Sequence, residues 1–195
     1  MKPVSSGYAA VNGIKMYHEL YGNGEPLVLI HGGLTTIGEM QGWVQPLAQT
    51  RRVIVVEMQG HGRTADTDRP MSFPTMGDDI TALLDQLKIP KADLVGHSFG
   101  GASALRAAIQ HRDKVRRLVV ISSPSCITAR ERHELMRRPF TCTVQAPHWP
   151  WSQPFLVPVR WIDSRRQSRS VVRGSSDRSY ERPLTCSETG MPASA

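Results

Sequence analysis

The stretch Gly96-His97-Ser98-Phe99-Gly100 decides the fold, because it joins an apolar run ending at Val95 to an alanine-rich segment, residues 101–110. The apolar run predicts a buried strand and the alanine-rich segment predicts a helix. The two glycines lack the Cβ atoms that would collide where a strand turns sharply into a helix. Such a turn exposes a serine hydroxyl above the positive end of the helix dipole. Ser98 is therefore a candidate nucleophile, and the backbone N–H of Phe99 is a candidate donor to an oxyanion.

A second glycine-rich loop, His31-Gly32-Gly33-Leu34, follows the continuous apolar run of residues 26–30. A run of this kind suits a strand that is buried on both faces. The glycine-rich bend after it can turn a backbone N–H toward the serine. We therefore expect a second oxyanion donor in this loop, which is Gly33, with Leu34 as the alternative.

Several histidines lie near these two stretches. We assign His31 and His97 to the substrate pocket, and we also expect His31 to brace its loop through hydrogen bonds. His61, in the loop Gln59-Gly60-His61-Gly62-Arg63, is interpreted as a residue that shapes its loop. Glu57, just before that loop, is interpreted as structural.

The first 125 residues alternate between strand patterns and helix patterns. Asn12-Gly13 separates two apolar stretches and is a strong hairpin signal, because both residues tolerate positive φ. Strands are expected at residues 26–30, 53–56, 91–95 and 117–122, and helices at residues 43–49, after Ser72 or Thr75, and at residues 101–110. This alternation predicts an α/β core over residues 1–125, with a doubly wound, mostly parallel sheet and an amino-terminal hairpin. Functional sites of such sheets lie at the carboxyl ends of the strands.

Three glycine-rich motifs occur in the order and spacing of the α/β-hydrolase fold family: His31-Gly32-Gly33, residues 59–64 and residues 96–101. Over about residues 8–124 the chain resembles the esterase, haloperoxidase and dehalogenase-like branch, which has a His-Gly-x oxyanion loop. The resemblance implies a serine hydrolase that attacks an ester-like or similar small substrate through an acyl-enzyme. It implies Ser98 as nucleophile, backbone oxyanion donors on both sides of it, and neither a metal nor an organic cofactor.

The histidine and the acid that such a serine needs are not convincing downstream. In the family they follow later strands, in the chain order Ser, Asp or Glu, His. No apolar run suited to a central strand follows Ile121, and residues 126–195 are expected to be irregular. The candidates there are in the wrong order or in a Ser/Arg-rich tract: His133, His148, Asp163 and Asp177. We therefore expect weak or no turnover, the alternative being a non-catalytic chain that binds or self-associates.

The composition changes near residue 125. Residues 1–125 hold 13 Lys+Arg and 11 Asp+Glu. Residues 126–195 hold 11 basic residues, all of them arginine, and 6 acidic ones. Low apolar content from residue 164 onward favours disorder. Three accounts of residues 126–195 remain open: a cap whose tryptophans line a pocket, a basic arm for nucleic acid, and translation in a shifted reading frame. We favour the last, because an Arg/Ser/Pro-rich stretch without lysine is what out-of-frame GC-rich DNA would encode, and because the hydrophobic periodicity stops at one point. The core is then expected to be truncated, without its carboxy-terminal strands.

Other features narrow the class of protein. No apolar run approaches the length of a membrane span, and the start of the chain lacks an apolar signal core, so we expect a cytoplasmic protein without a membrane partner. The three cysteines follow no pattern that predicts a disulfide framework or a zinc site. The arginines lack interleaved aromatics and a folded basic face, so nucleic acid is not the expected partner. The expected partner is a small-molecule substrate, and residues 118–121, as an unpaired apolar edge, are a candidate for self-association.

Overall fold

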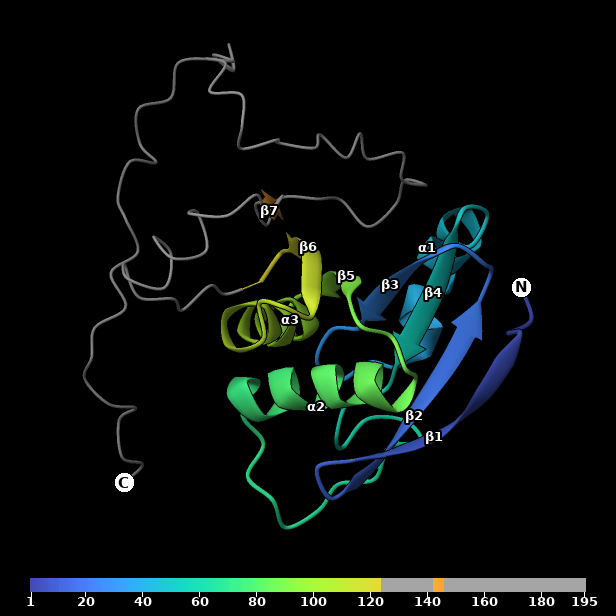
Figure 1. Ribbon diagram of the computed structural model, residues 1–195. Coiled ribbons are helices and arrows are strands. Elements are labelled where there is room, and N and C mark those ends of the chain that lie inside the picture. The colour runs from blue at the N-terminus through green and yellow to red at the C-terminus, as the bar shows by residue number, and fades with distance from the viewer. Residues whose placement is uncertain (124–141, 146–195) are drawn as a thin grey trace, which may run out of the picture. The chain divides into compact units, whose positions relative to one another are not determined.

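The structure is a computed structural model, and it describes residues 1–123 and 142–145. These residues build a seven-stranded sheet with the order β1-β2-β4-β3-β5-β6-β7 (Figure 1). Its strands are β1 Ser5–Val11, β2 Ile14–Tyr21, β3 Glu25–Ile30, β4 Arg51–Val56, β5 Ala92–His97, β6 Val115–Ile121 and β7 Cys142–Gln145. β2 runs antiparallel to β1 and β4, and the remaining neighbours are parallel. The predicted α/β class, with a mostly parallel sheet and an amino-terminal hairpin, is confirmed.

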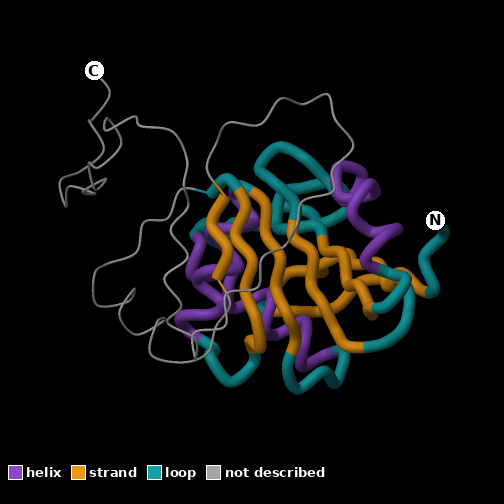
Figure 2. The backbone as a smooth tube through the Cα atoms, turned by 90° about the horizontal axis from the view of Figure 1, so that it is seen from above, coloured by secondary structure: helices purple, strands orange, loops and turns teal. Residues whose placement is uncertain are grey.

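Helices cover both faces of the sheet (Figure 2). They are α1 Ile37–Leu47, α2 Phe73–Gln86 and α3 Phe99–Gln110. On one face α1 buries Ile37, Met40 and Val44 among apolar side chains of β3 and β4. On the other face α2 and α3 share a second core with the opposite sides of the same strands. Because both faces are covered, the central strands read as continuous apolar runs rather than alternating ones.

The helices α1, α2 and α3 have 11, 14 and 12 residues. In the described part of the chain, none of them has the length and apolar content needed to cross a bilayer.

The amino-terminal hairpin forms as predicted. Val11 pairs with Ile14, so the turn consists of Asn12 and Gly13 alone. Both turn residues have positive φ, 43° and 88°, which matches the right-handed twist of the two strands.

The start of α2 was predicted correctly from the sequence, and the start of α1 was not. Ser72 precedes α2 and its Oγ accepts the Thr75 N–H at 3.2 Å, so Ser72 is the cap that the sequence left open. In contrast, α1 begins at Ile37 rather than near residue 43, because Thr36 caps it by accepting the Gly38 N–H at 3.2 Å. The prediction of a helix start near residue 43 is therefore wrong.

The last described strand corrects two expectations. β7 pairs in parallel with Leu118–Ile121 of β6, so a strand does follow Ile121, and residues 118–121 are not the unpaired edge of the sheet. Four residues between Pro139 and Pro147 are too few to show strand alternation in the sequence. Self-association through a sheet edge stays a prediction, without β6 as that edge. The other expectations for residues 126–195 lie outside the described residues.

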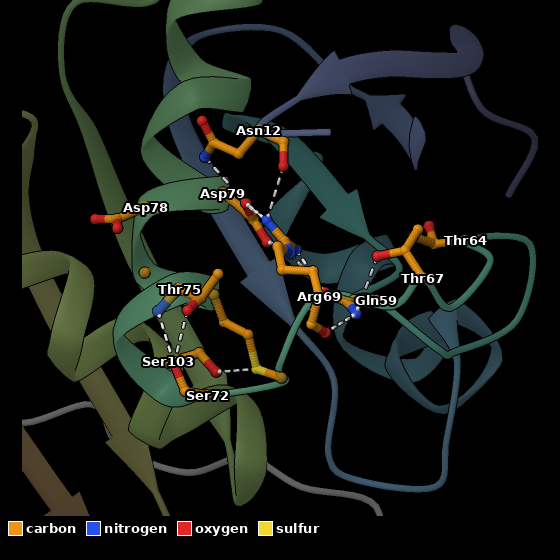
Figure 3. A network of polar contacts seen from close by, with 12 residues as sticks. Asn12, Gln59, Thr64, Thr67, Arg69, Ser72, Thr75, Asp78, Asp79 and Ser103 are labelled. Carbon is orange, nitrogen blue, oxygen red and sulfur yellow. Dashed lines mark hydrogen bonds and ion pairs between the residues drawn. The ribbon is translucent and has the colours of Figure 1, made fainter. Parts of the chain in front are cut away.

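A buried ion pair joins the hairpin, α2 and the loop after β4 (Figure 3). The Asp79 carboxylate is fully buried and accepts Arg69 Nη1 at 2.9 Å and Arg69 Nη2 at 2.7 Å. The Asn12 side-chain amide donates to the same carboxylate at 3.0 Å. Arg69 Nε also donates to Gln59 Oε1 at 3.0 Å. The hydrogen bonds to Asp79 raise the pKa of Arg69, so the guanidinium stays charged. These contacts fix the loop after β4 to α2 and to the hairpin.

Candidate active site

Ser98 sits at the sharp turn between β5 and α3, with φ 50° and ψ −113°. A non-glycine residue rarely adopts this backbone conformation, and such strain concentrates at functional sites. The turn is held because the Ser98 N–H donates to the Ile121 carbonyl at 2.8 Å, and the Ser98 carbonyl accepts the Gly101 N–H at 3.0 Å. The partly exposed serine therefore stands at the amino terminus of α3, where the helix dipole favours negative charge.

Two glycines allow this turn to lie against the sheet. A Cβ on Gly96 would lie 2.2 Å from the Gly100 carbonyl oxygen. A Cβ on Gly100 would lie 2.4 Å from the His31 carbonyl oxygen. Both contacts are with backbone, which cannot move aside like a side chain. The close approach of Gly100 to His31 also brings the loop after β3 next to the serine turn.

The two residues that carry the candidate oxyanion donors, Gly33 and Phe99, lie next to each other. A Cβ on Gly33 would lie 3.4 Å from the Phe99 Cβ, so these two residues are in contact range across the turn. Within residues 1–123 and 142–145, neither the Gly33 N–H nor the Phe99 N–H has a hydrogen-bond acceptor. The Leu34 N–H, in contrast, donates to His61 Nε2 at 3.2 Å. Of the two alternatives, Gly33 therefore has the unused amide.

His31 lies beneath the loop rather than in a pocket. Its side chain is fully buried, Nε2 accepts the Met58 N–H at 3.1 Å, and Nδ1 lies 2.6 Å from the Gly32 carbonyl oxygen. Because Nε2 accepts, Nδ1 carries the proton and donates to Gly32. Burial lowers the pKa of His31, so the ring is held neutral. His31 thus braces its loop, with both ring nitrogens engaged in hydrogen bonds. Its assignment to the substrate pocket stays a prediction.

His61 connects the second motif to the other two. Its Nδ1 lies 2.9 Å from the Gln59 carbonyl oxygen, while Nε2 takes the Leu34 N–H. Its ring centroid lies 4.9 Å from that of His31 and 5.6 Å from that of Phe99. The three glycine-rich motifs that are distant in sequence thus meet at the carboxyl edge of β3, β4 and β5.

Glu57 anchors the loop that carries His61. Its carboxylate accepts the Arg63 N–H at 2.6 Å and the Arg63 guanidinium at 2.9 and 3.0 Å. Burial alone would raise the pKa of Glu57, but the hydrogen bonds from Arg63 outweigh it and lower that pKa. A Cβ on Gly62 (φ +54°) would lie 2.5 Å from this carboxyl group. These contacts agree with the structural role expected for Glu57.

His97 is partly exposed and lies beside a residue that the sequence analysis missed. His97 Nδ1 is 3.2 Å from Glu39 Oε1, and its ring centroid is 6.3 Å from that of Trp43. Glu39 Oε2 accepts the Gly32 N–H at 3.2 Å. The signal for Glu39 was its place in the first turn of α1, which a helix start near residue 43 conceals.

The described residues do not complete a catalytic triad. Among residues 1–123 and 142–145, no histidine ring and no carboxylate forms a hydrogen bond with the Ser98 hydroxyl. The downstream candidates lie outside the described residues: His133, His148, Asp163 and Asp177. The described site therefore consists of a strained serine, two unused amides beside it and a helix amino terminus.

Comparisons with known proteins agree with this geometry. The family model of the alpha/beta hydrolase fold matches residues 25–152, which is more than half of the chain. The 2-hydroxymuconate semialdehyde hydrolase of Pseudomonas sp. (strain CF600) is 42% identical over 106 residues, covering 52% of this chain and 38% of that protein. The soluble epoxide hydrolase of Corynebacterium sp. (strain C12) is 34% identical over 116 residues, which cover 58% of this chain and 40% of that protein.

A solved structure shows the same likeness. The structure of Est816, described as an N-acyl homoserine lactone degrading enzyme, superposes with a TM-score of 0.57 at 35% identity. The match covers 60% of this chain and 45% of that one. The chain thus spans about two fifths of the length of the curated relatives named above. Because the family model matches more than half of the chain, and the three glycine-rich motifs meet at the serine turn, the chain belongs to the α/β-hydrolase fold family.

Proposed function

We propose that this chain carries the nucleophile and oxyanion half of a serine hydrolase site for an ester-like or similar small substrate. The observation that carries the proposal is the pair of unused amides, Gly33 and Phe99, beside a serine in a strained turn. In the proposed reaction, Ser98 Oγ attacks the carbonyl carbon, its proton passes to a base, and the carbonyl oxygen becomes an oxyanion. The two N–H groups and the dipole of α3 would stabilise that oxyanion. Collapse of this intermediate breaks the bond to the leaving oxygen, which takes up the proton from that base and departs as an alcohol, and an acyl-enzyme remains.

The names of the relatives support an ester-like substrate in a broad sense. They include a semialdehyde hydrolase, an epoxide hydrolase and a lactone-degrading enzyme. A lactone is a cyclic ester, so the Est816 likeness is the one most relevant to acyl transfer at a serine. We therefore propose small esters and lactones as the substrates to test first.

Turnover by this chain is proposed to be weak or absent. The Ser98 hydroxyl has no base among the described residues, so its proton has no acceptor there other than solvent. In serine hydrolases, losing a member of the triad leaves only about 10³–10⁴-fold catalysis over water, from the oxyanion hole and binding. The second candidate is therefore a chain that binds a small molecule without turning it over, or that self-associates. Cytoplasmic residence stays a prediction from the sequence.

One experiment separates these candidates. The full chain and its Ser98→Ala variant are incubated with a fluorophosphonate probe and, separately, with p-nitrophenyl acetate and a small lactone. We expect little labelling and a slow hydrolysis that falls further in Ser98→Ala, because an unassisted serine still has the two amides. Rapid labelling and a kcat in the ordinary enzyme range, both lost in Ser98→Ala, would show that a complete triad assembles. Hydrolysis equal in the two proteins would remove Ser98 as the nucleophile.

A further inference from the structure

The backbone amides of the loop after β3 are not equivalent. The Gly32 N–H donates to Glu39 Oε2 at 3.2 Å, and the Leu34 N–H donates to His61 Nε2 at 3.2 Å. The Gly33 N–H between them has no acceptor among the described residues. Side chains from two different elements thus occupy the flanking amides and leave the middle one unused.

On the Glu39 side, the N–H and the carbonyl oxygen of Gly32 both have hydrogen-bond partners. Glu39 takes the N–H, and His31 Nδ1 donates to the carbonyl oxygen at 2.6 Å. The Thr35 hydroxyl lies 2.5 Å from Glu39 Oε2 and 2.9 Å from the Gly32 carbonyl oxygen. A Cβ on Gly32 would lie 3.2 Å from His97 Nδ1 and 3.4 Å from Glu39 Oε2. Both backbone polar groups of Gly32 are therefore engaged, and the Gly32 carbonyl fixes the same peptide plane that carries the Gly33 N–H.

On the His61 side, a single hydrogen bond holds a strained residue. Leu34 has φ 61°, and its side chain is fully exposed, so side-chain packing does not stabilise this conformation. His61 can accept the Leu34 N–H because its Nδ1 hydrogen is directed to the Gln59 carbonyl oxygen 2.9 Å away. The neutral Nδ1–H form of His61 is thus the form that fixes Leu34.

We propose that Glu39 and His61 are positioning residues that clamp the oxyanion loop from both sides, so that Gly33 presents its N–H next to that of Phe99. The inference rests on the proposed function, because it gives the clamp its purpose. Neither residue touches the reacting atoms; each acts through the backbone amide that it accepts. Preorganised donors of this kind are effective because they need no rearrangement when charge develops.

The test follows the three loop amides directly in the ¹⁵N-labelled full chain, by nuclear magnetic resonance, as chemical shifts and as rates of hydrogen exchange with solvent. We expect Leu34 amide exchange to become about three- to tenfold faster in His61→Ala, because its acceptor is removed, and to stay the same in His111→Ala, a matched histidine variant at the end of α3. We expect Gly32 amide exchange to become at least about tenfold faster in Glu39→Ala, because a hydrogen bond to a charged acceptor is lost. Glu39→Gln, which keeps an acceptor, should restore protection, and Gln45→Ala on the same helix should change nothing.

Two results would overturn the clamp. The first is a Leu34 amide that exchanges equally fast in the unmodified chain and in a His61→Ala chain whose β1–β2 hairpin resonances show that it is folded. The second is a Gly33 resonance that is unchanged in both Glu39→Ala and His61→Ala. Phenylboronic acid, which forms a reversible adduct with a nucleophilic serine, separates the clamp from the proposed function. If the clamp results hold but the Gly33 and Phe99 amides ignore the boronate, the proposed function fails and the clamp stands.

Discussion

Replacing Asp79 by alanine should remove much of the stability of the fold. Its carboxylate is fully buried and accepts two hydrogen bonds from Arg69 and one from Asn12. Deleting one partner of a buried ion pair costs about 3–5 kcal/mol, because the other charge is left without compensation. Arg69 would keep its contact to Gln59, and its side chain is about one-fifth exposed, so we expect the lower half of that range, about 3–4 kcal/mol.

The measurement is urea unfolding followed by far-ultraviolet circular dichroism. Asp78→Ala is the matched control, because Asp78 precedes Asp79 on α2 and is about half exposed, so its contacts to Gln110 and His111 should contribute about 0–1 kcal/mol. In a double-mutant cycle, Arg69→Met should cost much less in the Asp79→Ala background than in the original chain. A loss below about 1 kcal/mol for Asp79→Ala, or additive effects of the two changes, would refute the reasoning.

Further predictions concern the serine turn and the buried histidine. Gly96→Ala should destabilise the fold by about 1–3 kcal/mol, because its Cβ would meet the Gly100 carbonyl oxygen at 2.2 Å. Gly42→Ala is the control: the position has open space in α1, so the change should stabilise the fold by about 0.5–1 kcal/mol. The midpoints of urea unfolding check both. Ser98→Gly should be more stable than Ser98→Ala by about 1 kcal/mol in the same assay, since glycine relieves φ 50° and ψ −113°; equal stabilities would show that the turn is unstrained. Burial lowers the pKa of His31 below its usual 6.5, so the unfolded chain binds a proton that the folded ring does not. Stability should therefore be full above about pH 6.5 and fall as the pH drops toward the folded-state pKa, and His31→Gln should flatten that slope in urea midpoints taken from pH 5 to 8.

The features that were predicted correctly from the sequence are those that a few neighbouring residues determine. The Asn12-Gly13 turn and the strand-turn-helix around Ser98 follow from residues that only certain backbone conformations tolerate, and both were placed correctly. The start of α1 was missed because Gly38, Gly42 and Pro46 lower helix propensity, while burial of Ile37, Met40 and Val44 against the sheet stabilises the helix.

Within the site, the sequence could not predict contacts between residues that lie far apart along the chain. The choice of Gly33 over Leu34 depends on His61 accepting an amide from a distant loop. The role of Glu39 could not be predicted, because it depends on α1 bringing the carboxylate within hydrogen-bond distance of the Gly32 N–H. The burial of His31 likewise depends on Met58 and Gly32 closing around it, which no local pattern records.

The contact between Gly100 and the His31 carbonyl has a consequence for how the chain matures during synthesis. The loop after β3 leaves the ribosome well before α3, yet its final shape depends on a residue of α3 that has no side chain. In the sheet, β3 is also flanked by β4 and β5, and β5 is translated much later than β3. The loop is therefore expected to acquire its working shape late and in one step with the serine turn, so that a nascent chain released before residue 100 would carry neither.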